Sequence, residues 1–178
     1  MSNELQCVVA GFGGQGSLFA GKVIAMAGLA EDREVSWMPS YGPEMRGGTA
    51  NCSVTLADEP IGSPLVLHPN ALIALNQPSF DKFLPTVVEG GTVIVDTAMV
   101  PNVTEAPGVN VIGFPATKMA EAQGLKGLSN IVLIGKLWKE TQFCTRESLD
   151  AAIEKVVPAS KPEKLEQNRK AIEIGIEA

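Results

Sequence analysis

The sequence is poor in the side chains that most often carry chemistry. Its 178 residues include one histidine and one tyrosine, and aromatic residues make up only 5% of the chain. The single histidine, His68, lies beside Pro69. We therefore expect neither a histidine-based catalytic triad nor a histidine metal site.

Cysteine is also scarce. Cys7, Cys52 and Cys144 are far apart and form no C-x-x-C pair. An odd number of scattered cysteines predicts neither a disulfide framework nor a zinc or iron–sulfur site. The simplest interpretation is three buried thiols in a reducing compartment.

Positive charge and long apolar runs are missing as well. The formal net charge is −6, with no basic stripe, so nucleic acid is not an expected partner. No apolar run reaches the ~18 residues that a membrane span needs. The first ten residues lack the basic start and cleavage site of a signal peptide, so we expect a cytoplasmic protein without a membrane partner.

What the chain does contain is the pattern of an α/β protein. Apolar residues make up 45%, and short buried runs alternate with helical segments over the first part of the chain. Strands are expected at Leu5–Gly11, Glu34–Met38, Thr49–Leu56, Ala71–Leu75, Thr92–Asp96 and Val109–Phe114, and helices at Gly16–Ala30 and Ser79–Leu84. The opening therefore predicts a βαβ unit. We expect one domain over residues 1–178, a three-layer α/β/α Rossmann-like fold with a mostly parallel sheet.

The last third predicts a helical C-terminal part. Helices are expected at Thr117–Gln123, Asn130–Glu140 and Thr145–Val157, and from a capping box at Ser160–Glu163 to the end. Asn130–Glu140 is apolar nearly all round, so it is either central or covered by another chain. In the isolated chain we expect exposed apolar surface around Asn130–Trp138, and a homodimer formed through it. The last helix, 160–178, has many charges and few anchors and is interpreted as a docking arm.

A glycine loop follows the first strand. The segment Gly11-Phe12-Gly13-Gly14-Gln15-Gly16 satisfies G-x-G-x-x-G at a strand-to-helix turn, and its candidate binding residues are Gly13, Gly14, Gln15 and Gly16. A dinucleotide site also needs an acidic residue at the end of the second strand, but Glu31 and Asp32 lie before that strand. The loop thus serves either close packing or anion binding at the helix start. A complete NAD or FAD site is disfavoured.

A second loop, Pro39–Gly48, is rich in proline and glycine. Pro43 fixes the backbone, and Gly47 and Gly48 allow conformations closed to other residues. Rigid loops after strands of an α/β sheet often build binding sites. The candidate residues are Ser40, Tyr41 for stacking, Glu44 for orienting Arg46, Arg46 for a phosphate or carboxylate, and the glycines Gly47 and Gly48. Alternatively, Glu44 and Arg46 pair with each other to hold the loop, or reach across a subunit interface.

These two loops together resemble a known signature. The glycine loop followed by Ser40-Tyr41-Gly42-Pro43-Glu44-x-Arg46-Gly47-Gly48 is similar to the gamma subunit of 2-oxoacid:ferredoxin oxidoreductases. The later segments Ala71–Gln77, Gly90–Asp96 and Pro115–Thr117 occur in the order that this family shows. The resemblance covers nearly the whole chain.

The resemblance implies a reaction shared among subunits. Such enzymes convert a 2-oxoacid and coenzyme A to acyl-CoA and CO₂ with thiamine diphosphate, Mg²⁺ and [4Fe-4S] clusters, and pass electrons to ferredoxin. This chain has no Gly-Asp-Gly motif for thiamine diphosphate and too few cysteines for a cluster. The resemblance therefore places those cofactors on the alpha, beta and, in some relatives, delta subunits, with ferredoxin an indirect partner. It leaves this chain without catalytic residues or a metal, as a scaffold whose glycine loop and Arg46 contact coenzyme A.

Three functional hypotheses remain. The first is the gamma subunit, with 2-oxoglutarate or a branched-chain oxoacid favoured as the substrate of the whole enzyme. The second is a free-standing dinucleotide-binding module, against which the missing acidic residue counts. The third is a structural spacer whose loops touch no ligand.

Overall fold

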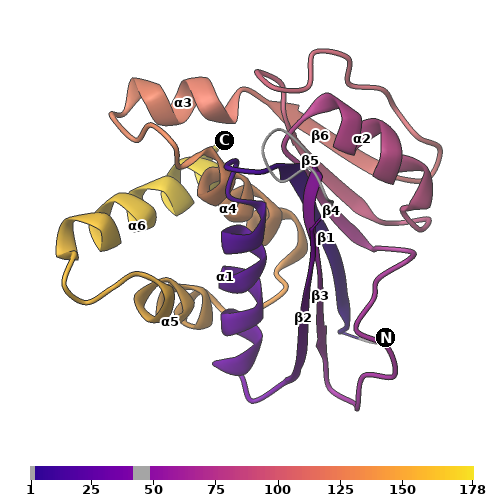
Figure 1. The fold of residues 1–178 in the computed structure, drawn as a ribbon, viewed down its shortest axis with the longest axis horizontal. Coiled ribbons are helices and arrows are strands. Elements are labelled where there is room, and N and C mark those ends of the chain that lie inside the picture. The colour runs from indigo at the N-terminus through magenta and orange to yellow at the C-terminus, as the bar shows by residue number, and fades with distance from the viewer. Residues whose placement is uncertain (1–2, 42–48) are drawn as a thin grey trace.

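A six-stranded sheet forms the centre of the computed structural model, which describes residues 3–41 and 49–178 (Figure 1). The strands lie in the order β2-β3-β1-β4-β5-β6. Their bounds are β1 Leu5–Phe12, β2 Glu34–Tyr41, β3 Thr49–Ala57, β4 Ala71–Ala74, β5 Thr92–Asp96 and β6 Asn110–Phe114. All six predicted strands are therefore present.

The sheet is parallel in one half and antiparallel in the other. β1, β4, β5 and β6 run parallel, whereas β3 is antiparallel to both of its neighbours, β1 and β2. The predicted mostly parallel sheet is confirmed. The predicted βαβ opening is present, because β1 and β2 are both antiparallel to β3 and therefore parallel to each other. The two strands are not adjacent, since β3 lies between them, and apolar periodicity carries no information about strand order.

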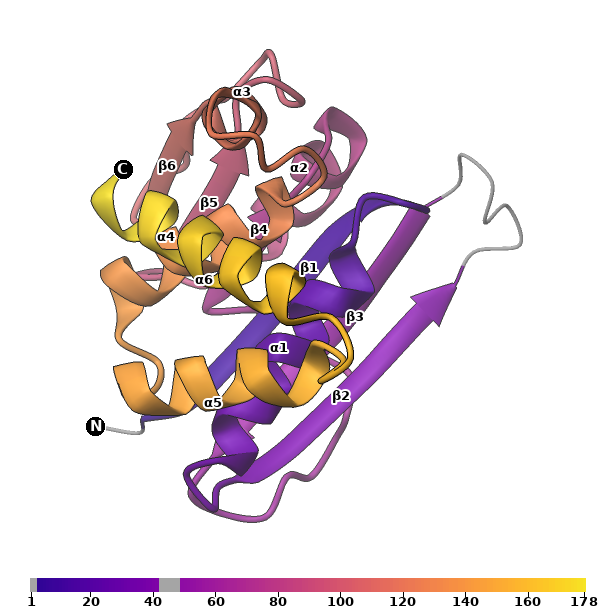
Figure 2. The same cartoon turned by 90° about the vertical axis from the view of Figure 1, so that its left-hand side faces the viewer.

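Helices cover both faces of the sheet, as the predicted three layers require. On one face lie α1 (Ser17–Leu29) and α4 (Ser129–Thr141), with α3 (Ala116–Ala122), α5 (Arg146–Val156) and α6 (Pro162–Glu177) packed around them (Figures 1 and 2). On the other lie α2 (Gln77–Phe83) and a 3-10 turn, η1 (Leu84–Thr86). Within the described ranges, no helix is both long and apolar enough to cross a bilayer.

Small residues in α1 bring this helix against the sheet. A Cβ added at Gly21 would lie 2.2 Å from Cys52 Sγ, and one at Gly28 would lie 2.4 Å from Leu56 Cδ2. Both distances are shorter than real Cβ contacts, so a larger residue at either position would displace a side chain of β3. α1 therefore packs on β1, the strand before it, and it also covers β2 and β3.

The C-terminal helices correct two predictions. The apolar stretch of α4 is buried from Asn130 through Leu137, so it exposes no apolar surface for a homodimer. Its cover is α6, whose Ala171, Ile172 and Gly175 are buried against it. The last helix is thus part of the core instead of a free docking arm, because small residues serve as its anchors.

The helix boundaries include one side-chain cap at the start of α5 and correct the capping box predicted for α6. Thr145 caps α5 by accepting a hydrogen bond from Ser148 N. The capping box at Ser160 does not form, since α6 begins at Pro162 and Lys161 precedes it without a side-chain cap. Pro39 lies inside β2 instead of in a loop, which the sheet permits because β2 is an edge strand.

Candidate functional site

The two predicted loops meet at one edge of the sheet. β1 ends at this edge, and the antiparallel β3 begins there, so Phe12 pairs with Thr49 and Gly11 with Ala50. Ala50 also pairs with Tyr41, at the end of β2. The carboxyl edge of parallel strands is where α/β proteins bind ligands. The structure therefore brings the glycine loop beside both ends of the segment 42–48.

Part of the predicted site lies outside the described residues. This applies to the candidate residues Glu44, Arg46, Gly47 and Gly48. Of the other candidates in that motif, Ser40 is exposed and pairs with Asn51 in the sheet register, and the backbone of Tyr41 closes β2. The remaining candidates belong to the glycine loop.

The glycine loop takes a left-handed conformation at two positions. The φ angles are 91° at Gly14 and 80° at Gly16, a region that favours glycine. Gly14 is exposed, and a Cβ there would meet no atom of the described residues within 4 Å. Gly16 stands at the N-cap of α1, and among residues 3–41 and 49–178 no side chain caps this helix start, so its first-turn N–H groups can meet an acceptor from a ligand. The loop thus presents the start of a 13-residue helix at the sheet edge.

Gln15 holds the loop together from within. Its Oε1 accepts hydrogen bonds from Phe12 N at 2.6 Å and from Asn76 Nδ2 at 3.0 Å, and its Nε2 donates to Leu75 O at 2.9 Å. Asn76 is buried and also caps α2, accepting from Ser79 N at 2.9 Å. The Gln15 side chain therefore ties the end of β1 to the end of β4 and positions the loop backbone.

Asn130, at the start of α4, holds the other end of the loop. Its Nδ2 donates to Gly16 O at 3.0 Å, and a Cβ at Gly16 would lie only 2.4 Å from that nitrogen. The side chain is 4% exposed. Sequence analysis missed both Asn76 and Asn130. The available signal was an amide next to each apolar run, one just after the strand Ala71–Ala74 and one at the start of the helix 130–140.

Asp96 is the buried carboxylate at this edge of the sheet. It is 1% exposed, and its Oδ1 accepts from Ala98 N at 3.0 Å while Oδ2 accepts from Thr117 N at 3.0 Å. The Thr117 hydroxyl also donates to Oδ2. Both oxygens are engaged in joining β5 to α3, so Asp96 has a structural part and is poorly placed as a general base.

The three cysteines do not fit an iron–sulfur cluster. All are buried, and burial raises the pKa of the Cys7 thiol well above its usual range. Burial also raises the pKa of Cys52 and of Cys144 to about 12. A cluster takes four thiolates, whereas these are three neutral thiols packed in apolar surroundings. Within residues 3–41 and 49–178, histidine, cysteine, aspartate and glutamate form no group of three suited to a metal.

The topology also bears on a dinucleotide site. Such a site relies on an acidic residue at the end of a second strand that lies directly beside the first. Here β3 separates β2 from β1, so the end of β2 is one strand removed from the glycine loop. The chain therefore differs from a dinucleotide-binding domain in two ways: the acidic residue at the end of the second strand is missing, and the strand order is different.

Known proteins of one family match this chain along nearly its whole length. Residues 6–178 match the model of a family described as pyruvate ferredoxin/flavodoxin oxidoreductase. The ketoisovalerate oxidoreductase subunit VorA of Methanothermobacter thermautotrophicus is 38% identical over 175 residues, which are 98% of this chain and 36% of VorA. The 2-oxoglutarate synthase subunit KorC of Methanocaldococcus jannaschii is 38% identical over 160 residues, covering 88% of this chain and 85% of KorC.

A solved structure agrees with these relatives. The gamma subunit of a keto/oxoacid ferredoxin oxidoreductase from Geobacter sulfurreducens superposes with a TM-score of 0.82 at 29% identity, over 97% of this chain and 96% of that one. The relatives differ in length, since the chain spans only 27% and 36% of the two VorA proteins that it matches. The same fold thus occurs both as a separate chain and as about a third of a longer one.

Proposed function

Because the chain belongs to the pyruvate ferredoxin/flavodoxin oxidoreductase family, in which it corresponds to the gamma subunit, we propose that it works within a multi-subunit 2-oxoacid oxidoreductase. The complete enzyme converts a 2-oxoacid and coenzyme A to acyl-CoA and CO₂ and delivers electrons to ferredoxin. Thiamine diphosphate, Mg²⁺ and the iron–sulfur clusters reside on the alpha, beta and, where present, delta subunits.

The side chains of the sheet edge support this division of labour. Gln15, Asn76 and Asp96 all use their polar atoms to fix the protein's own backbone. A residue that acts as base or nucleophile needs an atom free to meet the substrate. The arrangement favours a surface that binds a ligand and shapes its site, while neighbouring subunits supply the catalytic groups.

The binding role of this chain is contact with coenzyme A. The observation that carries this proposal is the register that sets the glycine loop beside both ends of the segment 42–48. Coenzyme A bears phosphates, which suit the N–H groups at the start of α1 together with a guanidinium. In this proposal the amides of Gly13, Gly14 and Gly16 and the side chain of Arg46 meet the phosphates. Ser40, Tyr41, Glu44, Gly47 and Gly48 shape the same surface, with Tyr41 available for stacking.

Replacement of Arg46 tests this contact. In the reconstituted enzyme, Arg46→Ala should raise the KM for coenzyme A roughly 10-fold or more, since a charge-assisted hydrogen bond contributes about 1.5–3 kcal/mol. The kcat should change little, because the interaction is equally present in ground and transition states. Steady-state kinetics with varied coenzyme A at saturating oxoacid would measure both.

Lys155→Ala provides the matched control. Lys155 is an exposed cation on α5, a helix that packs against α1 and α6. Its loss should leave the KM for coenzyme A unchanged. An Arg46→Ala enzyme with the same KM for coenzyme A as the control would remove the phosphate role of Arg46.

For the substrate, we favour 2-oxoglutarate or a branched-chain oxoacid. The relatives that share 38% identity with this chain carry the names 2-oxoglutarate synthase and ketoisovalerate oxidoreductase. Discrimination between the two belongs to the subunit that holds the oxoacid. We place the enzyme in the cytoplasm, where three unpaired thiols such as those of this chain remain reduced.

A further inference from the structure

The connection between β3 and β4 is longer than is needed to join these two strands. Only β1 lies between these strands, and β3 ends at the edge where β4 begins, since Leu5 pairs with Leu56 and Cys7 with Ala71. Neighbouring strands are about 4.8 Å apart, so about four residues would bridge the gap. The chain uses residues 58–70 instead, which we call the β3–β4 loop. Ordered loops of this length are uncommon and usually functional.

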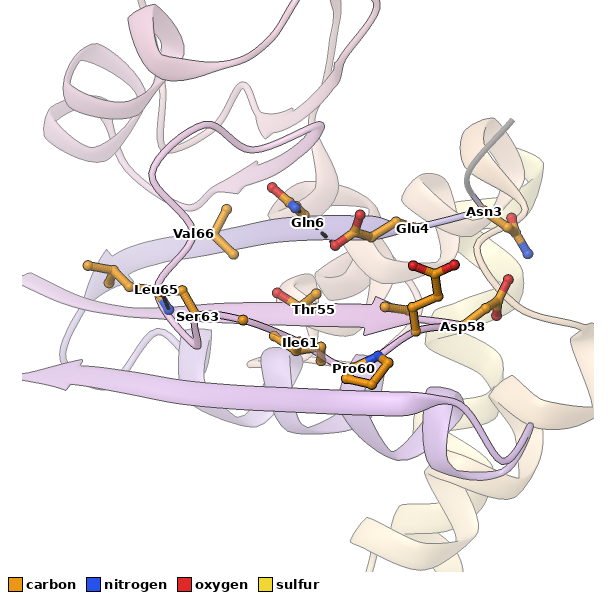
Figure 3. Close-up of a pocket in the computed structure, with 13 residues that line it drawn as sticks. Asn3, Glu4, Gln6, Thr55, Asp58, Pro60, Ile61, Ser63, Leu65 and Val66 are labelled. Atoms are coloured by element: carbon orange, nitrogen blue, oxygen red, sulfur yellow. Dashed lines mark hydrogen bonds between the residues drawn. The ribbon is translucent and has the colours of Figure 1, made fainter.

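This loop is anchored to the sheet. Val66 is 8% exposed and packs with Val8 and Leu72, and its N–H donates to Ser53 Oγ at 3.1 Å. Prolines at positions 60, 64 and 69 restrict the backbone on both sides of the anchor. The loop therefore follows a fixed path across the face of the sheet on which α2 lies (Figure 3).

The residues on either side of the anchor point outward. Leu65 is 50% exposed and Leu67 is 64% exposed. Met38 on β2 pairs with Ser53, so its side chain leaves the sheet on the face that the loop crosses, and it is 42% exposed. These three side chains, Met38, Leu65 and Leu67, are named the leucine patch. Clustered exposed apolar side chains mark an interaction surface.

An acidic pocket of about 480 Å³ adjoins the leucine patch. Glu4, Asp58 and Glu59 line it, and Figure 3 places Glu4 and Asp58 at one end and Leu65 at the other. Asp58 lies 3.4 Å from Arg33 Nε, while Glu4 accepts a hydrogen bond from Gln6 Nε2. The surface is thus apolar at one end and negatively charged at the other.

We propose that the β3–β4 loop docks this chain onto a neighbouring oxidoreductase subunit, the polypeptide that corresponds to the remaining two thirds of VorA. Its leucine patch enters an apolar recess, and a lysine or arginine beside that recess enters the acidic pocket. The inference rests on the proposed function, because it takes the neighbour to be a subunit of that enzyme. The matching domain makes up most of KorC but only 36% of VorA. It therefore needs a surface that contacts the part of the enzyme to which the rest of VorA corresponds.

Charge argues against a second copy of this chain as the occupant. A twofold contact centred on the acidic pocket would set its three carboxylates against three identical ones. Like charges brought together in an interface weaken association. The net charge of −6 adds to the repulsion. A partner with basic residues around an apolar recess has neither problem.

A double substitution tests the docking. Leu65→Asp with Leu67→Asp should weaken binding of this chain to the purified neighbouring subunit by about 100-fold, because two buried leucines are lost from the interface. Both side chains are exposed in the free chain, so its melting temperature should stay the same. Leu29→Asp is the matched control, since Leu29 is 51% exposed at the end of α1, and it should alter binding less than about 3-fold. Isothermal titration calorimetry would measure the dissociation constants.

A charge reversal tests the acidic pocket separately. Glu59→Lys should weaken the same complex by about 10-fold at low salt, and the loss should shrink near 0.5 M NaCl, where exposed charges are screened. A loss that is independent of salt, or no loss, would remove the basic partner residue from the proposal.

The outcomes separate the two proposals. If the wild-type chain binds its neighbour and the double variant binds equally well, the docking loop is wrong and the proposed function stands. If the wild-type chain binds no oxidoreductase subunit, the proposed function fails and the docking proposal with it. If instead the wild-type chain forms a homodimer that the double substitution dissociates, a second copy is the occupant and the proposal is overturned.

Discussion

Amide side chains determine the shape of the candidate site. Gln15 ties the glycine loop to β4, and Asn130 ties it to α4. Each bond joins residues that are far apart in sequence, so the loop acquires its conformation only when the whole sheet edge has assembled. The loop is consequently pre-organised, which lowers the entropy lost when a ligand binds.

The buried thiols make stability depend on high pH. Burial raises the pKa of Cys52 to about 12 from the ordinary value of 9.0. Because the folded chain then keeps its proton longer than the unfolded chain, this stabilisation is complete below pH 9 and is lost as the pH rises from 9 to 12. The free energy of unfolding should fall over this window by about 1.4 kcal/mol per pH unit more in the wild type than in Cys52→Ala. Urea titrations at several pH values would measure both slopes, and equal slopes would contradict a neutral buried thiol.

At the scale of single residues, the sequence predicts which residues form the site better than it predicts their hydrogen-bond partners. The glycines at positions 14 and 16 were recognisable, because their spacing at a strand end is typical of a positive-φ turn. The binding role expected of Gln15 could not be separated from a positioning role. Its partners Leu75 and Asn76 come close only through the pairing of β1 with β4, which no local pattern reveals.

Close contact of α4 and α6 is the main feature at the scale of elements. A Cβ added at Gly175 would lie 1.9 Å from Val132 O, and one at Gly135 would lie 2.2 Å from Ile172 O. The two backbones therefore approach each other through paired glycines. This packing buries the apolar face of α4 and removes it from solvent.

Substitution of Gly175 tests this packing. Gly175→Ala should destabilise the chain by about 1–3 kcal/mol, because the added methyl group forces two backbones apart and outweighs the gain in helix propensity. Gly62→Ala is the matched control. A Cβ there meets nothing within 4 Å in the part of the chain that the structure describes, and its effect should stay within about 0.5 kcal/mol. Chemical denaturation would give both values, and a Gly175→Ala chain as stable as the control would contradict the close contact.

The elements themselves were largely predictable, but their arrangement was not. Apolar runs of β-branched residues located all six strands, and Thr145 correctly marked the start of α5. The antiparallel insertion of β3 was not predictable, because a strand buried on both faces has the same apolar pattern in either direction. The role of α6 was misjudged because two of the residues buried beside Ile172 are Ala171 and Gly175, which contribute little to an apolar stripe.

For the whole molecule, the two surfaces of interest begin at opposite edges of the sheet. The glycine loop lies at the carboxyl edge of the parallel strands, and the β3–β4 loop leaves β3 at the other edge. If one face of the chain binds coenzyme A and the other binds a neighbouring subunit, the subunit holds the chain in place while the first face meets coenzyme A. This arrangement suits a subunit that completes a binding site without performing the reaction.

The dependence of this chain on neighbouring subunits can be measured as turnover with defined subunits. CO₂ release from 2-oxoglutarate and from 2-ketoisovalerate would be measured with coenzyme A and ferredoxin, using this chain alone, the other subunits alone, and the complete mixture. We expect no turnover by the chain alone, and coenzyme A-dependent turnover only when it joins the other subunits. Turnover by the isolated chain, or full activity of the others without it, would show that the chain does not depend on its neighbours in this way.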